Sequence, residues 1–312
     1  MTIKVFIDGG AGTTGLEIAA RLAERSEFSL IALSDKERKS TSARAEALSQ
    51  ADFAILCLPD AAARETVSLA EGQKVRIIDA SSAHRVADGW TYGFPEFRNG
   101  QRDAIRNAAR VSNPGCYPTG FLALVTPLVE RGLLPADHGY AVNAVSGYSG
   151  GGKDMIERFA KHETDIAFRA YALALEHKHL PEMQVHAGLS RMPLFAPAVV
   201  NAYRGMLVEV PLFLDAELGF ADATSLHDAL DAHYADAPLI TVAPQNATPS
   251  ELMIRDSGDA NDRLELFVLP SADGSQVRLI ATLDNLGKGA SGAAVQNLNI
   301  MAGPDELAGL RI

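Results

Sequence analysis

The sequence has 312 residues, 47% of them hydrophobic, and its 28 Lys and Arg against 39 Asp and Glu give a formal net charge of −11. This length suffices for two domains or for one domain with an insertion. An acidic chain without a basic face is not expected to bind nucleic acid. No apolar run approaches the roughly 18 residues of a transmembrane helix. Since no signal peptide precedes the first predicted strand and the two cysteines suggest no disulfide framework, we expect a cytoplasmic, reducing location.

The first eighty residues alternate between strand and helix patterns. Apolar runs predict strands at residues 3–8, 28–34, 51–59 and 74–81. Helix patterns lie between them, at residues 16–26, from the end of the second strand to about residue 50, and at 60–71 with Asp60 as N-cap. Nearly continuous apolar strands joined by helices indicate a parallel, doubly wound sheet.

Beyond residue 120 the pattern changes. A helix kinked or interrupted at Pro127 is predicted over 121–134, and a strand that runs into a glycine-rich loop over 139–152. Few helices separate the strand candidates that follow, which are residues 198–213, 238–244, 264–270 and 276–284. The final segment, 287–303, is helical by pattern. Together these elements predict a second α+β domain with a mixed or antiparallel sheet.

Three glycines, Gly9, Gly12 and Gly15, separate the first strand from the first helix. Glycine permits a tight turn and the close approach of a pyrophosphate, and the N-terminus of the next helix supplies N–H donors and a partial positive charge. A plain glycine turn is the alternative, but a strand–loop–helix context is what dinucleotide-binding folds require. We therefore predict that this loop, which includes Thr13 and Thr14, binds a dinucleotide.

The loop after the second predicted strand carries charges of both signs. Asp35 could hold the ribose diol of NAD, whereas hydroxyl and basic side chains suit the 2′-phosphate of NADP. The side chains of the second kind are Ser34, Lys36, Arg38 and Lys39. The basic cluster favours NADP; the alternative is a solvent-exposed loop without a ligand.

Cys116 lies in a turn rich in chain breakers, SNPGCYPTG (112–120), directly before a predicted helix. A thiol at a helix N-terminus feels the positive end of the helix dipole, which lowers its pKa and favours the thiolate. The turn at 113–115 could present the sulfur at the mouth of a cleft. We therefore predict a nucleophile rather than a bland buried thiol. Cys57, in contrast, lies inside an apolar strand and is predicted to be core.

A nucleophilic cysteine also needs a base. Two histidines lie in the segment EHKHLPE (176–182). If its first part is extended, His177 and His179 point the same way, and Pro181 and Glu182 begin a helix. A metal site or a structural role is the alternative for these histidines. Because no third ligand of fixed geometry is evident, we predict no metal.

Over nearly its whole length the chain resembles the N-acetyl-gamma-glutamyl-phosphate reductases of arginine biosynthesis, in their shorter form. The segments that carry the resemblance are GGAGTTG (9–15), DASSAHR (79–85), SNPGCYPT (112–119), SGYSGGGK (146–153), HKHLPE (177–182) and DNLGKGASGAAVQN (284–297). Aspartate-semialdehyde dehydrogenases are a related family with the same plan. Thr13 departs from the longer reductases, and Ser81 with Ser82 resembles the aspartyl enzymes, whereas the cysteine and histidine segments resemble the glutamyl ones.

The resemblance implies an α/β fold in which a Rossmann-type doubly wound parallel sheet is joined to an α+β catalytic and dimerisation domain with a mixed sheet. The C-terminal helix would return to the nucleotide domain. Residues 1–115 and 285–312 would then form the NADP-binding domain, and residues 116–284 the catalytic and dimerisation domain. A homodimer or homotetramer is implied, as are an acyl-phosphate substrate and phosphate as a product.

The resemblance also implies roles for single residues. Cys116 matches the nucleophile and His179 the acid/base, although the residues alone leave open which histidine titrates. The implied substrate-binding residues are Arg85 (on the phosphate, or otherwise in a surface ion pair), His177, Glu182 and Ser149. The implied cofactor-binding residues are Gly9, Gly12, Thr13, Thr14, Gly15, Ser34, Arg38, Ser81, Gly150 and Asn285.

The implied reaction is the NADPH-dependent reductive dephosphorylation of N-acetyl-L-glutamyl 5-phosphate to the semialdehyde through a thioester on Cys116. The first alternative is an aspartate-semialdehyde dehydrogenase or a related acyl-phosphate reductase, because only the acyl chain differs. An alternative of another class is a non-catalytic, NADP-sensing Rossmann protein, which would need no hyper-reactive cysteine.

Overall fold

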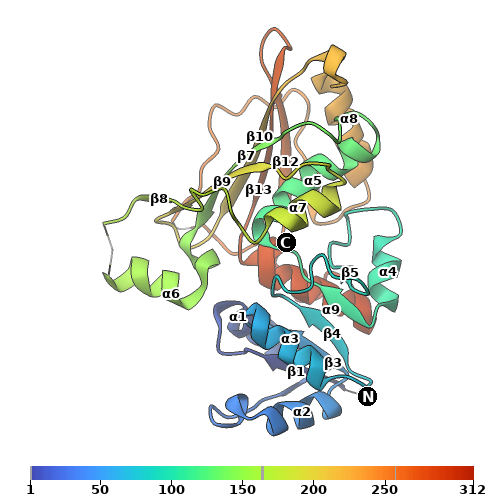
Figure 1. The fold of residues 1–312 in the computed structure, drawn as a ribbon, viewed down its shortest axis with the longest axis vertical. Helices are drawn as coiled ribbons and strands as arrows, with labels where there is room; N and C mark the ends of the chain where they lie inside the picture. The colour runs from blue at the N-terminus through green and yellow to red at the C-terminus, as the bar shows by residue number, and fades with distance from the viewer. Residues whose placement is uncertain (1, 163–164, 257) are drawn as a thin grey trace. The chain divides into compact units, whose positions relative to one another are not determined.

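A computed structural model describes residues 2–162, 165–256 and 258–312. The chain divides into two compact units (Figure 1). Unit 1 comprises residues 1–95, 99–115 and 290–311; unit 2 comprises 96–98, 116–289 and the terminal Ile312. Residues 285–289, which the sequence-based boundary places with the nucleotide domain, therefore belong to unit 2. In the described part of the chain, no helix has the length and apolar character needed to span a bilayer.

Unit 1 contains a six-stranded sheet, here called sheet A, in the order β2-β1-β3-β4-β6-β5, with every pair of neighbours parallel. Its strands are β1 Ile3–Asp8, β2 Phe28–Ile31, β3 Phe53–Leu56, β4 Arg76–Asp79, β5 Thr91–Tyr92 and β6 Arg110–Ser112. Its helices are α1 Thr13–Ala23, α2 Thr41–Gln50, α3 Asp60–Leu69, α4 Gln101–Asn107 and α9 Gly292–Ala302, with a 3-10 turn η1 at Glu37–Lys39. The predicted parallel, doubly wound sheet is confirmed.

Two separate hydrophobic cores cover the two faces of sheet A, so unit 1 has three layers. On one face, side chains such as Val5 and Ile78 pack with α1, α4 and α9. On the other, side chains such as Phe6 and Ile77 pack with α2 and α3. Neighbouring residues of one strand thus point into opposite cores, which explains why the strands read as continuous apolar runs.

Unit 2 contains a seven-stranded mixed sheet, sheet B, in the order β11-β12-β13-β10-β7-β9-β8. Its strands are β7 Ala141–Gly147, β8 Phe168–Ala170, β9 Leu194–Val200, β10 Met206–Phe213, β11 Ile240–Val242, β12 Leu264–Pro270 and β13 Gln276–Leu283. Its helices are α5 Cys116–Glu130, α6 Gly152–Glu157, α7 Leu180–Ala187 and α8 Ala223–Tyr234. Short 3-10 segments are η2 Tyr148–Gly151 and η4 Ala216–Leu218. π-Helical segments are η3 Arg158–His162 and η5 Gly287–Ser291, the last of which crosses the boundary between the units. The expected mixed sheet is confirmed.

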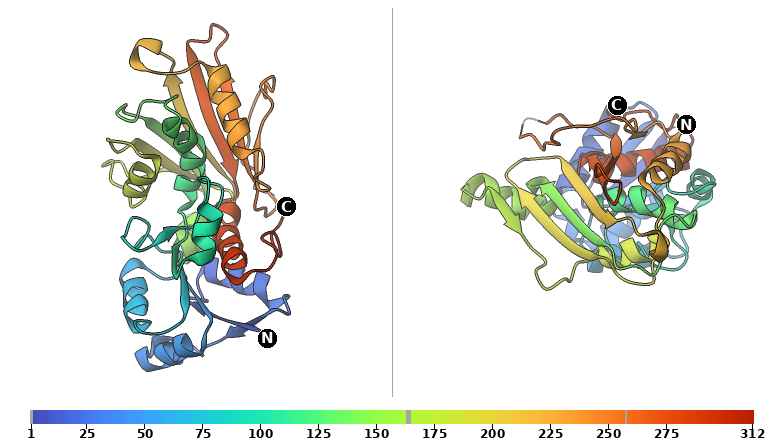
Figure 2. Two further views of the ribbon diagram at one scale, coloured as in Figure 1. Left: turned by 90° about the vertical axis from the view of Figure 1, so that its right-hand side faces the viewer. Right: turned by 90° about the horizontal axis from the view of Figure 1, so that it is seen from above.

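One face of sheet B is covered by helices. α5 packs on β10 and β13, and α8 packs on β11 and β12, while α7 lies against α5 (Figures 1 and 2). On the opposite face, Phe267 and Ile280 form a small core with Leu252 from the loop that follows β11. Further along that face β10 ends at Phe213, which is 74% exposed.

α5 runs without a break through Pro127, so of the kink or interruption predicted there, the interruption is absent. A proline cannot donate a hydrogen bond to the carbonyl four residues earlier. In this helix that carbonyl belongs to Ala123, and it accepts a hydrogen bond of 2.9 Å from the Tyr234 hydroxyl on α8. The helix therefore keeps its buried course because a neighbouring helix supplies the missing donor.

Two local expectations are corrected. Asp60 is not an N-cap: the cap is Pro59, and Asp60 is the first residue of α3, where its carboxylate accepts hydrogen bonds from the backbone and hydroxyl of Ser82. The single strand candidate at 198–213 is two strands of sheet B that run in opposite directions, β9 and β10, separated by residues 201–205. A continuous apolar pattern does not reveal such a chain reversal.

Candidate active site

Cys116 is the first residue of α5, as its place after a Pro-Gly turn predicts. Its backbone lies against Gly289, where an added Cβ would be 2.9 Å from the Cys116 Cβ. No acidic residue occupies the first turn of α5, so the positive end of the helix dipole is not offset there. Cys57 differs sharply, because burial raises the pKa of its thiol to about 12.

The two predicted histidines lie side by side just before and at the start of α7. Their ring centroids are 4.7 Å apart. The Nδ1 atom of His177 accepts a hydrogen bond of 3.1 Å from the backbone N–H of His179. This contact fits the tautomer of His177 that carries its proton on Nε2. His179 has a helical conformation at the N-cap of α7 rather than the extended one considered above.

A chain of hydrogen bonds then leads away from His177. Its Nε2 lies 3.5 Å from the Tyr171 hydroxyl, which donates to the Tyr117 hydroxyl at 3.3 Å. Tyr117 in turn donates to the carbonyl of Ala198 at 3.0 Å. Because the chain ends on a carbonyl, every hydroxyl in it has a fixed direction, and His177 enters it as the donor. This orientation makes His177 a poor base and favours His179 for proton transfer.

Tyr171 is a site residue that the motifs did not reveal. Burial, together with the charge of the nearby Cys116, raises its pKa to about 12, so the Tyr171 hydroxyl stays protonated near neutral pH. Burial and the neighbouring Tyr171 and Cys116 also raise the pKa of Tyr117, whose ring centroid lies 6.0 Å from that of His179. The two tyrosines thus connect the surroundings of the cysteine with those of the histidines. Tyrosine at 171 directly after a short strand carries no pattern that could have identified it.

The glycine-rich loop after β7 and the segment after β13 meet through two polar side chains. The Asn285 amide donates to the Ser149 hydroxyl at 2.9 Å and accepts from the backbone N–H of Gly205 at 2.9 Å. Asn285 and Ser149 are both buried, whereas Gly150 is exposed. An amide has two N–H donors and two oxygen lone pairs. These two hydrogen bonds use one N–H and one lone pair of Asn285.

Glu182 and Arg85, predicted to bind substrate, are both buried. Glu182 lies in the first turn of α7, where the helix dipole stabilises a carboxylate. Arg85, in unit 1, donates from Nε to the carbonyl of Asn113 at 3.0 Å and from Nη2 to that of Ala80 at 3.1 Å. Arg85 is therefore buried rather than at the surface, and it braces the backbone of the loop before Cys116.

The glycine loop of unit 1 has the geometry that a dinucleotide needs. A Cβ at Gly9 would lie 2.2 Å from the carbonyl oxygen of Cys57, and one at Gly15 would lie 2.6 Å from that of Gly9. α1 starts at Thr13 with no acidic residue in its first turn. The Thr13 Oγ1 is buried and has no hydrogen-bond partner among the described residues. The loop therefore allows a pyrophosphate to come close to the backbone. The N-terminus of α1 and the Thr13 hydroxyl could both bind its oxygens.

The residues expected to determine the preference for NAD or NADP interact with acidic side chains of the same loop. The Ser34 hydroxyl and backbone N–H donate to the Glu37 carboxylate at 2.6 and 2.9 Å, which lowers the pKa of Glu37. Arg38 forms an ion pair with Asp35. Ser81 lies apart from this loop and donates to Asp79 at 2.8 Å. A 2′-phosphate at Ser34 and Arg38 would therefore replace their carboxylate partners.

Gly9→Ala is expected to weaken NADPH binding at least about tenfold, because the new methyl group pushes the loop away from Cys57. Gly72→Ala is the matched control: both glycines have positive φ, +87° and +76°, but no atom of the described part of the chain lies within 4 Å of a Cβ at Gly72. Both variants pay roughly 1–2 kcal/mol of backbone strain. Fluorescence titration with NADPH and thermal melts separate the two effects. Equal NADPH affinity in the two variants would contradict a binding role for the loop.

Two family models match the chain. The semialdehyde dehydrogenase NAD binding domain matches residues 4–108, and the semialdehyde dehydrogenase dimerisation domain matches residues 116–285. The curated relatives include the N-acetyl-gamma-glutamyl-phosphate reductases of Brucella ovis and Brucella anthropi, each 49% identical to this chain. Each alignment spans 97% of this chain, and the two alignments span 100% and 99% of the respective relative.

Solved structures with the same fold are aspartate semialdehyde dehydrogenases. The Vibrio cholerae enzyme II complexed with ASA has a TM-score of 0.71 at 19% identity, over 97% of this chain and 98% of that one. The Candida albicans enzyme with NADP has a TM-score of 0.65 at 15% identity, over 97% and 99%. At these identities the likeness concerns the fold.

Proposed function

This chain belongs to the N-acetyl-gamma-glutamyl-phosphate reductases of the semialdehyde dehydrogenase family, and we propose that it reduces N-acetyl-L-glutamyl 5-phosphate to N-acetyl-L-glutamate 5-semialdehyde through Cys116. The observation that supports this chemistry is the arrangement in unit 2: a cysteine at the first position of α5, near a tyrosine and histidine network that favours His179 over His177 as the base. The relatives with 49% identity support the glutamyl substrate over an aspartyl one.

In the first half of the proposed reaction the Cys116 thiolate attacks the acyl carbon of the substrate. A carbon–sulfur bond forms, the bond from that carbon to the phosphate oxygen breaks, and phosphate leaves with its electron pair. The product is a thioester on Cys116. The dipole of α5 supports this step because it stabilises the thiolate at its N-terminus.

In the second half the thioester is reduced. NADPH, when bound, supplies the hydride to the thioester carbon. His179 donates a proton to the oxyanion that results and takes it back when the thiohemiacetal collapses. The carbon–sulfur bond then breaks, the thiolate is restored and the semialdehyde departs. Tyr117 and Tyr171 keep their protons throughout because their pKa values are raised, so His179 is the group near Cys116 suited to moving a proton.

We assign substrate contacts to His177, Glu182 and Ser149, which lie in the same unit as Cys116. To donate to a substrate oxygen, the His177 Nε2–H would exchange its 3.5 Å contact with the Tyr171 hydroxyl for one with the substrate. Arg85 would bind the phosphate as well as support the loop before Cys116.

We assign cofactor binding to the loop that holds Gly9, Gly12, Thr13, Thr14 and Gly15. Ser34 and Arg38 would contact the 2′-phosphate of NADP, and Ser81, Gly150 and Asn285 the nicotinamide end. The tight approach at Gly9 and Gly15 supports the assignment of the loop, as does the Thr13 hydroxyl, which has no hydrogen-bond partner among the residues that the structure describes.

A dimerisation domain predicts self-association, and we propose a homodimer or a homotetramer formed through the face of sheet B opposite to α5 and α8. The loop residue Leu252 covers only part of that face, and Phe213 remains largely exposed on it. We also propose a cytoplasmic location, because a nucleophilic thiol must stay reduced.

The substrate is tested by the reverse reaction, followed through the absorbance of NADPH. With NADP and phosphate, N-acetylglutamate semialdehyde is expected to give a signal and aspartate semialdehyde little. Signal with aspartate semialdehyde alone would favour the aspartyl alternative, and silence with both, in protein shown to bind NADP, would favour a nucleotide sensor.

A further inference from the structure

Unit 2 contains a fully buried ion pair that the proposed reaction does not use. The Lys288 Nζ lies 2.9 and 2.8 Å from the two carboxylate oxygens of Glu96, and the side chains are 1% and 0% exposed. Removing two charges from water carries a large desolvation penalty, so such a pair is weak evidence for stability as such. Because the pair adds little to stability, we looked for a role in the positions that it imposes on nearby residues.

The pair connects two distant parts of the chain. Lys288 lies in η5, directly before Gly289. Glu96 lies in the three-residue segment 96–98, which belongs to unit 2 although the chain on both sides of it belongs to unit 1. The backbone carbonyl of Glu96 also lies 3.1 Å from the Nε2 of His233 on α8. Lys288 is thus tied to a segment that α8 also contacts.

The residue after Lys288 lies against the nucleophile. A Cβ at Gly289 would be 2.9 Å from the Cβ and 3.3 Å from the Cα of Cys116, a spacing that only glycine allows. Any displacement of η5 would therefore open a gap beside Cys116 or push on its backbone. The position of η5 and the position of the thiol are coupled by direct packing.

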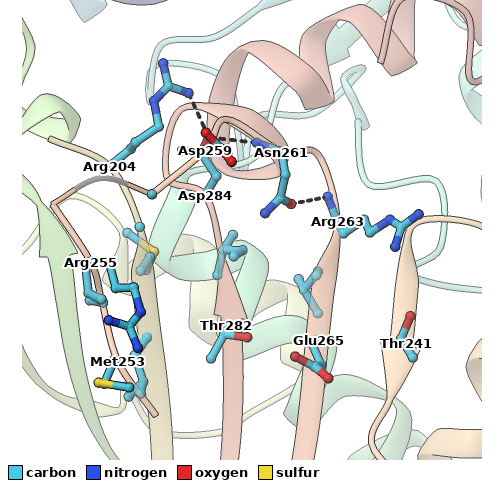
Figure 3. Close-up of a pocket in the computed structure, with 17 residues that line it drawn as sticks. Arg204, Thr241, Met253, Arg255, Asp259, Asn261, Arg263, Glu265, Thr282 and Asp284 are labelled. Carbon is cyan, nitrogen blue, oxygen red and sulfur yellow. Dashed lines mark hydrogen bonds and ion pairs between the residues drawn. The ribbon is translucent and has the colours of Figure 1, made fainter. Parts of the chain in front are cut away.

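The opposite end of the same segment is held separately. The Asp284 carboxylate accepts from Arg204 at 2.7 Å and from the backbone N–H of Asn261 at 3.3 Å (Figure 3). Asp284 also accepts at its backbone oxygen from the N–H of Gly289, at 3.0 Å. The segment 284–289 is therefore held in place near both ends, by the contacts of Asp284 and by those of Lys288.

We propose that the Glu96–Lys288 pair is a positioning pair, which holds Gly289 against Cys116 and so fixes the nucleophile for attack on the acyl phosphate. The inference rests on the proposed function, because it takes Cys116 as the nucleophile. An ion pair with two short hydrogen bonds sets both distance and direction, whereas apolar side chains of similar volume would fill the space without setting either. Both residues act on Cys116 indirectly, through the position of Gly289.

The test compares three variants with the wild type. Glu96→Gln keeps the shape and removes the negative charge; Lys288→Met removes the positive charge; and Glu96→Leu with Lys288→Met replaces the pair by apolar side chains. Small displacements of reacting groups cost on the order of 100-fold in rate. We expect kcat to fall roughly 10- to 100-fold in all three, with the KM for the acyl phosphate and the Kd for NADPH little changed.

A second readout is the rate at which iodoacetamide alkylates Cys116, located by peptide mass spectrometry. The pKa of about 12 keeps Cys57 unreactive near neutral pH. We expect slower alkylation of Cys116 in all three variants. The matched control is Glu130→Gln, which breaks the more exposed ion pair that joins Arg98, in the same segment as Glu96, to the end of α5. This control is expected to keep wild-type kcat and alkylation.

The double variant separates positioning from stability. Replacing both charges is expected to recover most of the melting temperature lost in Lys288→Met, while kcat stays low. Wild-type kcat and alkylation in the double variant would overturn the proposal, as would losses in Glu96→Gln that merely follow the fraction of folded protein. Failure of the proposed function is distinct, because it would appear as turnover that survives Cys116→Ser.

Discussion

Replacing Cys116 with serine is expected to abolish turnover and to leave NADPH binding intact. A serine hydroxyl at this position has a far higher pKa than a thiol, and the dipole of α5 cannot generate the alkoxide. Loss of a nucleophile costs roughly 10⁴-fold or more in kcat. The glycine loop lies in the other unit, so its affinity for NADPH should not change. NADPH consumption and a fluorescence titration measure the two quantities.

Cys57→Ser is the control for this variant, because Cys57 packs at the edge of the core of unit 1 and burial keeps its thiol protonated. It is expected to lose some stability and to keep its activity. Turnover in Cys116→Ser at more than a few percent of the wild type would show that the sulfur does not form the intermediate.

The second large effect is expected at His179. His179→Asn should lower kcat by about 10²- to 10⁴-fold, the usual contribution of a general acid or base. His177→Asn should cost much less, since the asparagine oxygen can replace the His177 Nδ1 as acceptor of the His179 backbone N–H. Both rates are measured at saturating NADPH, with thermal melts to show that the proteins are folded.

The two histidine variants form a matched pair, because the substitution is the same and the positions are two residues apart. A larger loss of kcat in His177→Asn than in His179→Asn would reverse the assignment of the acid/base. Such a result would mean that the His177 ring does not hold its proton in the hydrogen-bond chain through Tyr171 and Tyr117 to the Ala198 carbonyl.

Much of the fold follows from local patterns. Four apolar strands, the last of them at 74–81, and the glycine turn after β1 could be predicted because each depends only on neighbouring residues in the sequence. Cys116 was predictable for the same reason, since a Pro-Gly turn followed by an apolar helix pattern needs no distant partner. The mixed sheet of unit 2 was predictable only as a class, because the pairing of β7 with β9 and β10 joins distant segments.

What escaped prediction depends on contacts between residues far apart in the sequence. The role of Arg85 as a brace requires the carbonyl of Asn113, and the choice between the histidines requires Tyr171 and Tyr117. The contacts of the Asn285 amide with Ser149 and Gly205 could not be predicted either. None of these partnerships leaves a spacing pattern in one sequence.

The ion pair between Glu96 and Lys288 is the extreme case. Its residues are 192 positions apart, and a single lysine or glutamate in a sequence normally indicates solvent exposure. Only the fold shows that both are buried and that Gly289 carries their position to Cys116.

A single-turnover measurement tests the thioester on Cys116 most directly. The enzyme is mixed with N-acetylglutamate semialdehyde and excess NADP in the absence of phosphate, and NADPH absorbance and intact protein mass are followed together. The account predicts a burst of one NADPH per active site and an acyl adduct on the Cys116 peptide, both followed by steady turnover when phosphate is added. NADPH formation without an adduct on that peptide, or turnover that starts at full rate without phosphate, would contradict it.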